Sequence, residues 1–184
     1  MAGLVELAVH ESVKSLVERS SSRAQQVLVN EARINQMEIQ IDEMATRLLA
    51  TQQPMARDLR FLTAAIKINN DLERMGDLAV NIVERALSLI EQPPIHPAVD
   101  IPRMAELARN VLLSDDAVDD LRDDIYQELI RFMQAEPDAI PRAIDLLFVA
   151  RNLERIADHA TNIAEDVLFL VQGVDVRHHA EERR

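Results

Sequence analysis

A stretch of thirteen residues occurs twice in the chain, and this duplication constrains the fold more than any other feature. The first copy covers residues 72–84 and the second covers residues 153–165, with no gap between the two when they are aligned. All five strongly polar positions of the first copy recur in the second. The matching pairs are Glu73 and Glu154, Arg74 and Arg155, Asp77 and Asp158, Asn81 and Asn162, and Glu84 and Glu165. An internal repeat of this kind predicts a fold built from two similar units.

The polar residues of each copy fall on one face of a helix. At 100° per residue from Glu73, Glu84 lies at about 20°, Asp77 at about 40° and Asn81 at about 80°. On the opposite side, between about 140° and 280°, lie Leu72, Met75, Leu78, Ala79, Ile82 and Val83. We therefore expect each of the two helices to bury its apolar face and to point its acidic stripe outwards.

The acidic stripes have two interpretations. For a single copy, the ordinary interpretation is a charged helix face that is exposed to solvent. Repetition of the same acids favours a function, because like charges at i, i+4 cost a few tenths of a kcal/mol. A multivalent cation bound by carboxylate oxygens would offset that cost. The predicted metal-binding residues are Glu73, Asp77, Asn81, Glu84, Glu154, Asp158, Asn162 and Glu165. Oxygen ligands do not identify the metal, and iron, zinc, manganese and magnesium are the candidates.

Composition supports an all-α protein and excludes several classes of partner. The 184 residues are 48% hydrophobic but only 3% aromatic, which is typical of helices packed through aliphatic side chains. The chain has no cysteine, which excludes disulfides and thiolate metal sites. Its net charge of −12 argues against nucleic acid or anionic lipid as a direct partner. The first residues do not resemble a signal peptide, and no apolar run is long enough to cross a bilayer, so we expect a cytoplasmic protein.

Apolar periodicity predicts helices over residues 3–18, 22–51, 55–91, 103 onwards, a segment to 134, and 139–172. Ser20–Ser22 is a candidate cap, Pro54 the expected first residue of the third helix, and Gly173 the end of the last. Gly76, in the middle of the third helix, costs about 1 kcal/mol relative to alanine. Either another group approaches the backbone closely at this position, or the helix simply tolerates the glycine. Residues 174–184 are polar and expected to be frayed.

Four prolines between residues 93 and 102 predict a stiff, non-helical spacer. It divides the chain into a first half, residues 1–92, and a second half, residues 103–184. After it come two rows of aspartates at helical spacing, which we interpret as a solvated acidic face. The rows are Asp115, Asp119 and Asp123, and Asp116, Asp120 and Asp124.

The motif Glu-Arg-x-x-Asp-x-x-x-Asn, once per half, together with the upstream Gln53-Pro54-x-x-x-Asp58-Leu59-Arg60, resembles the PhoU family. These proteins are accessory regulators of the bacterial phosphate-specific transport system. The resemblance extends from about residue 4 to residue 178 and implies two tandem three-helix bundles, one per half. It also implies a negative regulator without enzymatic activity, which couples the ATPase subunit of the phosphate ABC transporter to a sensor histidine kinase. Such a protein would be a homo-oligomer, a homodimer by resemblance, that reaches the membrane only through its partners and carries metal ions on its acidic stripes.

The chain departs from the family pattern in two places. Its first helix begins late. Only eleven residues separate Pro102 from Ser114, where the family has a full helix and a connector. Either the second bundle is shortened in this protein, or residues of that bundle are missing from the sequence.

Three further residues are candidates for supporting or interaction roles. Arg74 and Arg155 flank the stripes and either orient the carboxylates or form i, i+3 pairs with Asp77 and Asp158. The family resemblance implies an interaction role for Asp58. A negative charge is, however, also favourable at the N-terminal end of a helix, so Asp58 could serve only that purpose.

Catalysis has little support in the sequence. No serine-centred turn motif occurs, and a ferritin-like di-iron enzyme would need Glu-x-x-His, which is absent. His159 is interpreted as a residue at the edge of the buried face rather than a ligand. A metalloenzyme that uses the same carboxylates and a metal-free helical scaffold are the alternatives to a metal-binding regulator.

Overall fold

A computed structural model describes residues 1–97, 99–109 and 115–173, and within these ranges the chain contains helices and no strand. The all-α prediction is therefore confirmed. The helices are α1 (Ala2–Val17), α2 (Ser21–Gln52), α3 (Arg57–Ile90), α4 (Ile101–Arg109), α5 (Asp115–Ala135) and α6 (Ile140–Gln172), with a short 3-10 helix, η2 (Pro137–Ala139), before α6.

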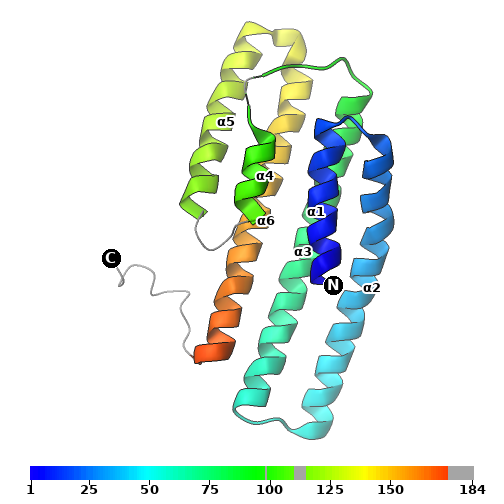
Figure 1. The fold of residues 1–184 in the computed structure, drawn as a ribbon, viewed down its shortest axis with the longest axis vertical. Coiled ribbons are helices and arrows are strands. Elements are labelled where there is room, and N and C mark those ends of the chain that lie inside the picture. Colours follow the sequence, from blue (N-terminus) through cyan, green and yellow to red (C-terminus); the bar gives the residue numbers. More distant parts are fainter. Residues whose placement is uncertain (98, 110–114, 174–184) are drawn as a thin grey trace.

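The helices form two three-helix bundles that lie side by side. Helices α1, α2 and α3 make the first bundle, and α4, α5 and α6 make the second. The two motif-bearing helices, α3 and α6, run antiparallel and pack against each other along the boundary between the bundles (Figure 1). The repeat expected from the duplicated motif therefore appears as a duplicated bundle.

The second bundle is shorter than the first. Helix α4 has 9 residues where α1 has 16, and α5 has 21 where α2 has 32. Helices α3 and α6 are nearly equal, with 34 and 33 residues. In Figure 1 the C-terminal part of α6 therefore extends beyond the ends of α4 and α5, whereas α2 accompanies α3 to its end. Over the described residues, α4 and α5 are thus shorter than α1 and α2, in line with the eleven-residue interval.

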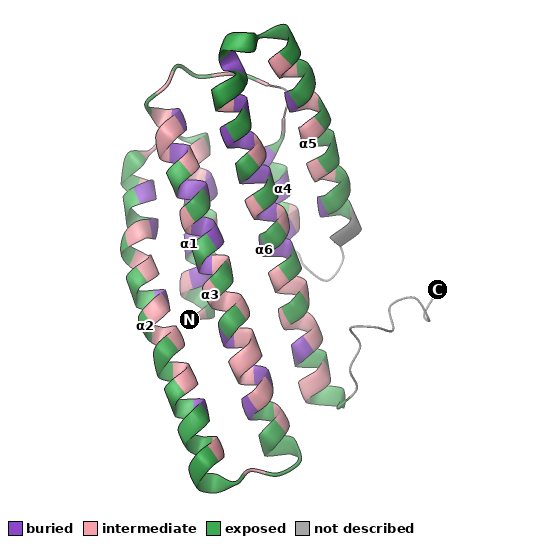
Figure 2. Ribbon diagram, turned by 180° about the vertical axis from the view of Figure 1, so that it is seen from behind, coloured by how far each residue is buried: buried purple, intermediate pink, exposed green. Residues whose placement is uncertain are grey.

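The larger of two buried clusters draws side chains from both bundles. Leu78 and Ile82 of α3 lie in it together with Leu129 of α5 and Leu153 of α6. Ile82, Leu129 and Leu153 are completely buried. The smaller cluster belongs to the first bundle alone and includes Ile34 of α2. Purple segments in Figure 2 mark these buried faces, and the two bundles share one hydrophobic core.

Two expectations about prolines were wrong. Pro54 is not the first residue of the third helix, which begins at Arg57. Gln53 and Ala56 take positive φ values of 46° and 48°, which interrupt the helical path on both sides of Pro54. Pro102 was expected to belong to the non-helical spacer, but it is the second residue of α4. A proline in the first turn is tolerated because the N–H that it lacks would have no partner there.

The other helix boundaries largely follow their sequence signals. Helix α6 ends at Gly173, whose φ of 72° confirms the predicted left-handed cap. Ser20 precedes α2 but makes no side-chain capping bond; its hydroxyl lies 3.0 Å from that of Ser22. A Cβ on Gly76 would lie 3.3 Å from Cγ2 of Ile34, so the close approach of α2 explains this glycine. Ser114 and the predicted frayed tail, residues 174–184, lie outside the described residues.

Among the described helices, none combines the length and the apolar character needed to cross a bilayer.

Candidate functional site

The acidic stripes lie on the outward faces of α3 and α6, as the periodicity predicted. Asp77, Asn81 and Glu84 of α3 are exposed, and Glu73 is half-buried. On α6, the exposed residues of the stripe are Asp158 and Asn162, whereas Glu154 and Glu165 are half-buried. Apolar residues between the stripe positions point into the core, for example Ile82 and Ala157. The helical register of the two copies therefore places both stripes within reach of an ion or a partner.

In the first bundle, three carboxylates from two helices gather at Glu73. Burial raises the pKa of Glu73, and the neighbouring charges of Asp77 and of Glu38 on α2 raise it further. A hydrogen bond with Asp77 acts in the same direction, and the nearby guanidinium of Arg74 only partly opposes these effects. The folded protein therefore binds a proton at Glu73 more readily than an exposed glutamate does.

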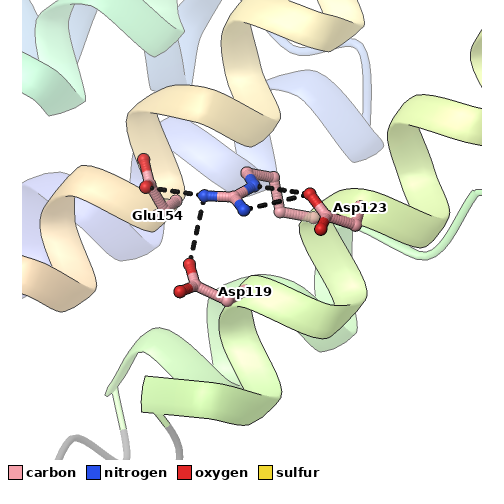
Figure 3. Close-up of polar contacts among 4 residues, drawn as sticks. Asp119, Asp123 and Glu154 are labelled. Atoms are coloured by element: carbon pink, nitrogen blue, oxygen red, sulfur yellow. Dashed lines mark hydrogen bonds and ion pairs between the residues drawn. The ribbon is translucent and has the colours of Figure 1, made fainter.

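In the second bundle, an arginine occupies the centre of the corresponding group. Arg122 of α5 places Nη1 2.9 Å from Oε1 of Glu154 and 3.1 Å from Oδ1 of Asp119, and Nη2 3.0 Å from Oδ1 of Asp123. Figure 3 shows the guanidinium between the three carboxylates. The hydrogen bond to Asp123 is the main cause of the raised pKa of Arg122. The second stripe is thus partly neutralised from within the chain.

Glu38 and Arg122 are the members of these groups that the sequence did not reveal. Each lies on a helix other than the motif helix, and helical spacing within one segment carries no information about which side chain a second helix brings. The aspartate rows on α5 do behave as a solvated face, because Asp119, Asp120, Asp123 and Asp124 are exposed. The side chains of Asp115 and Asp116 lie outside the described part of the structure.

The two stripes differ in how well they suit a metal ion. Within residues 1–97, 99–109 and 115–173, no three His, Cys, Asp or Glu side chains are already arranged as a metal site. Glu38, Glu73 and Asp77 come nearest in chemistry, since they supply only oxygen donors and their mutual repulsion would be relieved by a cation. At the second stripe, Arg122 already binds Glu154. The first stripe is therefore the better fit.

The remaining candidate residues lie at the surface or at the boundary between the bundles. Arg74 and Arg155 are exposed beside the stripes, and Asp58 is exposed in the first turn of α3. His159 is largely covered, and its Nδ1 lies 2.8 Å from Oδ1 of Asp71 on α3. It is therefore a residue at the edge of the core, as its place on the helix predicted, and it links α6 to α3.

Comparison with known proteins gives a consistent picture. The sequence-family model of the PhoU domain matches residues 1–86 and 101–167 of this chain. Each matched segment therefore contains one acidic stripe. A phosphate-specific transport system accessory protein PhoU homolog from Pseudomonas aeruginosa is 39% identical over 97% of this chain and 82% of its own length. The second PhoU homolog of Thermotoga maritima is 35% identical over 92% of this chain and 80% of its own length.

Solved structures share the fold. The crystal structure of PhoU from Pseudomonas aeruginosa superposes with a TM-score of 0.84 at 37% identity and covers 94% of this chain and 92% of its own. The phosphate transport system regulatory protein PhoU from Streptococcus pneumoniae gives a TM-score of 0.74 at 25% identity, over 95% of this chain and 91% of its own. The two matched segments, the duplicated bundles and these relatives together show that the chain belongs to the PhoU family.

Proposed function

We propose that this protein is an accessory regulator of phosphate uptake and of phosphate-starvation signalling. The observation that carries the proposal is membership of the PhoU family along both halves of the chain. The names of its relatives agree, since they describe accessory and regulatory proteins of the phosphate-specific transport system. No catalytic constellation is needed for this role, which consists of binding partners in a way that depends on phosphate supply.

The proposed partners are the ATPase subunit of the phosphate ABC transporter and a sensor histidine kinase. The protein would act in the cytoplasm as a homodimer and would help to hold the kinase in its repressing state while phosphate is ample. The outward-facing stripes on α3 and α6 support a role in binding, because they display acids on a rigid pair of packed helices.

The metal proposal concerns both stripes, with different affinities. Glu73, Asp77, Asn81 and Glu84 would hold an ion with help from Glu38, and the ion would relieve the repulsion that raises the pKa of Glu73. Glu154, Asp158, Asn162 and Glu165 would hold one only after Arg122 moves away from Glu154. The first stripe would therefore keep its ion under conditions in which the second loses it. The ion would be iron, zinc, manganese or magnesium.

Elemental analysis tests the metal proposal on protein purified without added ions. Replacing Glu73 and Asp77 by alanine is expected to remove more metal than replacing Glu154 and Asp158. Exposed carboxylates outside the stripes, Glu136 and Asp138, give a matched control pair. Metal content that stays constant in both stripe variants would exclude the stripes as ligands.

The regulatory role is tested in a bacterium that lacks its own PhoU protein and carries a reporter repressed by phosphate. Expression of this chain is expected to restore repression at high phosphate, and pull-down with the purified ATPase subunit should show a direct complex. Reporter activity that remains unrepressed, together with no complex, would contradict the proposal.

Two alternatives predict different results. Phosphoester turnover by metal-loaded protein, abolished by Asp77→Asn, would favour a metalloenzyme. Metal-free protein of unchanged stability that still binds the ATPase subunit would favour a scaffold without metal.

A further inference from the structure

Equivalent positions of the two repeats differ in burial on one helix face. Ala79 and Ile82 of α3 are completely buried, whereas their repeat equivalents on α6, Ala160 and Ile163, are half-buried. Farther along, Ala86 is completely buried and its equivalent Val167 is 44% exposed. The residues on α6 are as apolar as those on α3, so the difference lies in what covers them.

In the part that the structure describes, α4 covers less of α6 than α1 covers of α3. In the first bundle, Ala79 lies in a buried cluster with Val5 and Ala8 of α1, which runs along α3 for 16 residues. Helix α4 takes the corresponding place in the second bundle, and its described part, Ile101–Arg109, spans 9 residues. Figure 2 shows the consequence, since the buried segments of α6 become sparse toward its C-terminal end.

A groove of about 690 Å³ lies beside this surface of α6, between α1 and the described part of α4. Its floor consists of Leu72 and Met75 of α3 and Ile156, Ala160 and Ile163 of α6. The size lies within the range of protein ligand sites, which is roughly 300–1,000 Å³.

The apolar floor continues along α6 beyond the groove. At 100° per residue from Ile156, Ala160, Ile163, Val167 and Val171 all fall within about 60° of the same direction. Val167 is 44% exposed and Val171 75% exposed. At 1.5 Å per residue, the stripe from Ile156 to Val171 is about 22 Å long, which corresponds to roughly four helical turns. The apolar stripe is thus long enough to accept a helix of about four turns.

The rim of the groove carries more acidic than basic side chains. Glu6 and Glu18 of α1 and Glu106 of α4 line it and are exposed, together with Lys14 and His10. Since Glu18 is already paired with Arg23 at 2.7 Å, Glu6 and Glu106 give the rim its acidic character. The whole chain carries a net charge of −12. Acidic groups around an apolar floor favour an occupant with basic residues beside an apolar face.

We propose that this groove, with the apolar stripe that continues from it along α6, docks a basic amphipathic helix of a partner protein. Helix-in-groove recognition uses apolar anchors at i, i+3, i+4 and i+7, which match the spacing of the floor residues on α6. The chain's own C-terminal residues are a poor occupant, since 174–184 contain only Val174, Val176 and Ala180 as apolar residues. The surface differs from the acidic stripes and requires no metal.

The test uses the full chain and a fluorescently labelled model peptide. The peptide is a lysine–leucine helix of about five turns, with leucines at i, i+3, i+4 and i+7. A scrambled peptide of the same composition and charge controls for simple attraction to an acidic protein. Fluorescence anisotropy is expected to show at least about tenfold tighter binding of the amphipathic peptide, equivalent to about 1.4 kcal/mol.

Variants locate the binding site. Ala160→Glu in the floor and Val167→Glu on the exposed continuation are each expected to weaken binding by about tenfold or more. Val29→Glu is the matched control, because Val29 is 61% exposed on α2 and does not line the groove. Glu6→Lys is expected to weaken binding and to reduce its dependence on salt. Circular dichroism checks that each variant remains folded, and Val167→Glu, at an exposed site, keeps the test decisive if Ala160→Glu unfolds.

Three results would overturn the proposal. The first is equal affinity for the amphipathic and scrambled peptides. The second is unchanged affinity in the folded Val167→Glu and Ala160→Glu variants. The third is a change from dimer to monomer in Ala160→Glu, measured by light scattering, which would identify a second copy of this chain as the occupant.

Discussion

Arg122 offers the sharpest test of how the second stripe is held. Its side chain is 24% exposed, and its partner Glu154 is 20% exposed. The other two carboxylates are much more open, with Asp119 54% and Asp123 70% exposed. Arg122→Met removes the charge but keeps most of the aliphatic stem, so that lost packing contributes little.

The expected cost follows from these exposures. Ion pairs with open carboxylates contribute about 0.2–1 kcal/mol at most. A hydrogen bond to a charged group is worth about 1.5–3 kcal/mol when buried, and the partial exposure of Glu154 reduces this value. We expect the free energy of unfolding to fall by about 1–2 kcal/mol in total. For a chain of this size, that lowers Tm by about 3–6 °C.

A double-mutant cycle with Glu154→Gln isolates the central pair, measured by denaturant unfolding at low salt. The expected coupling energy is about 1 kcal/mol. Arg131→Met on the same helix is the control, since Arg131 is 72% exposed and its pair with Glu128 is 3.4 Å long; we expect a change below about 0.5 kcal/mol. A coupling below about 0.3 kcal/mol would refute the view that Arg122 takes the place of a cation at Glu154.

Three further predictions concern stability. Folding raises the pKa of Glu73, so ionised Glu73 destabilises the native state of the metal-free protein, and in that protein Glu73→Gln should raise the free energy of unfolding at pH 7 by a few tenths of a kcal/mol. This gain should vanish below about pH 4, and a difference that stays constant with pH would contradict the prediction. Gly76→Leu should cost about 1–3 kcal/mol in denaturant unfolding, because the new side chain meets buried Ile34; a neutral result would mean that α2 moves aside. Ile82→Ala should cost about 2–5 kcal/mol and its repeat equivalent Ile163→Ala less than about 1.5 kcal/mol, with equal costs refuting the difference in burial.

The sequence predicted the helices well because their signals are local. The apolar period placed α1, α2, α3 and α6 to within a few residues, together with the start of α4 and the end of α5, and Gly173 marked the end of α6. The turn before α3 was the exception. Nothing in the pattern around Pro54 indicates that Ala56 takes a positive φ, which is unusual for alanine.

The candidate site was predicted only in part. Helical spacing was enough to place Glu73, Asp77 and their equivalents on one outward face. It did not indicate that Arg122 reaches Glu154, or that Glu38 lies near Glu73, because both contacts depend on how neighbouring helices pack. The short interval after Pro102 indicated a reduced second bundle, but the groove beside α4 also depends on where α1 lies.

The shared core has a consequence for how the protein folds. Leu78 and Ile82 from one half pack in the same cluster as Leu129 and Leu153 from the other, so separating the halves would expose part of this cluster on each. Backbone cleavage between α3 and α4 should therefore leave two fragments that regain their full structure only when mixed. We expect the two similar halves to fold as one cooperative unit, rather than as two independent bodies joined by a tether.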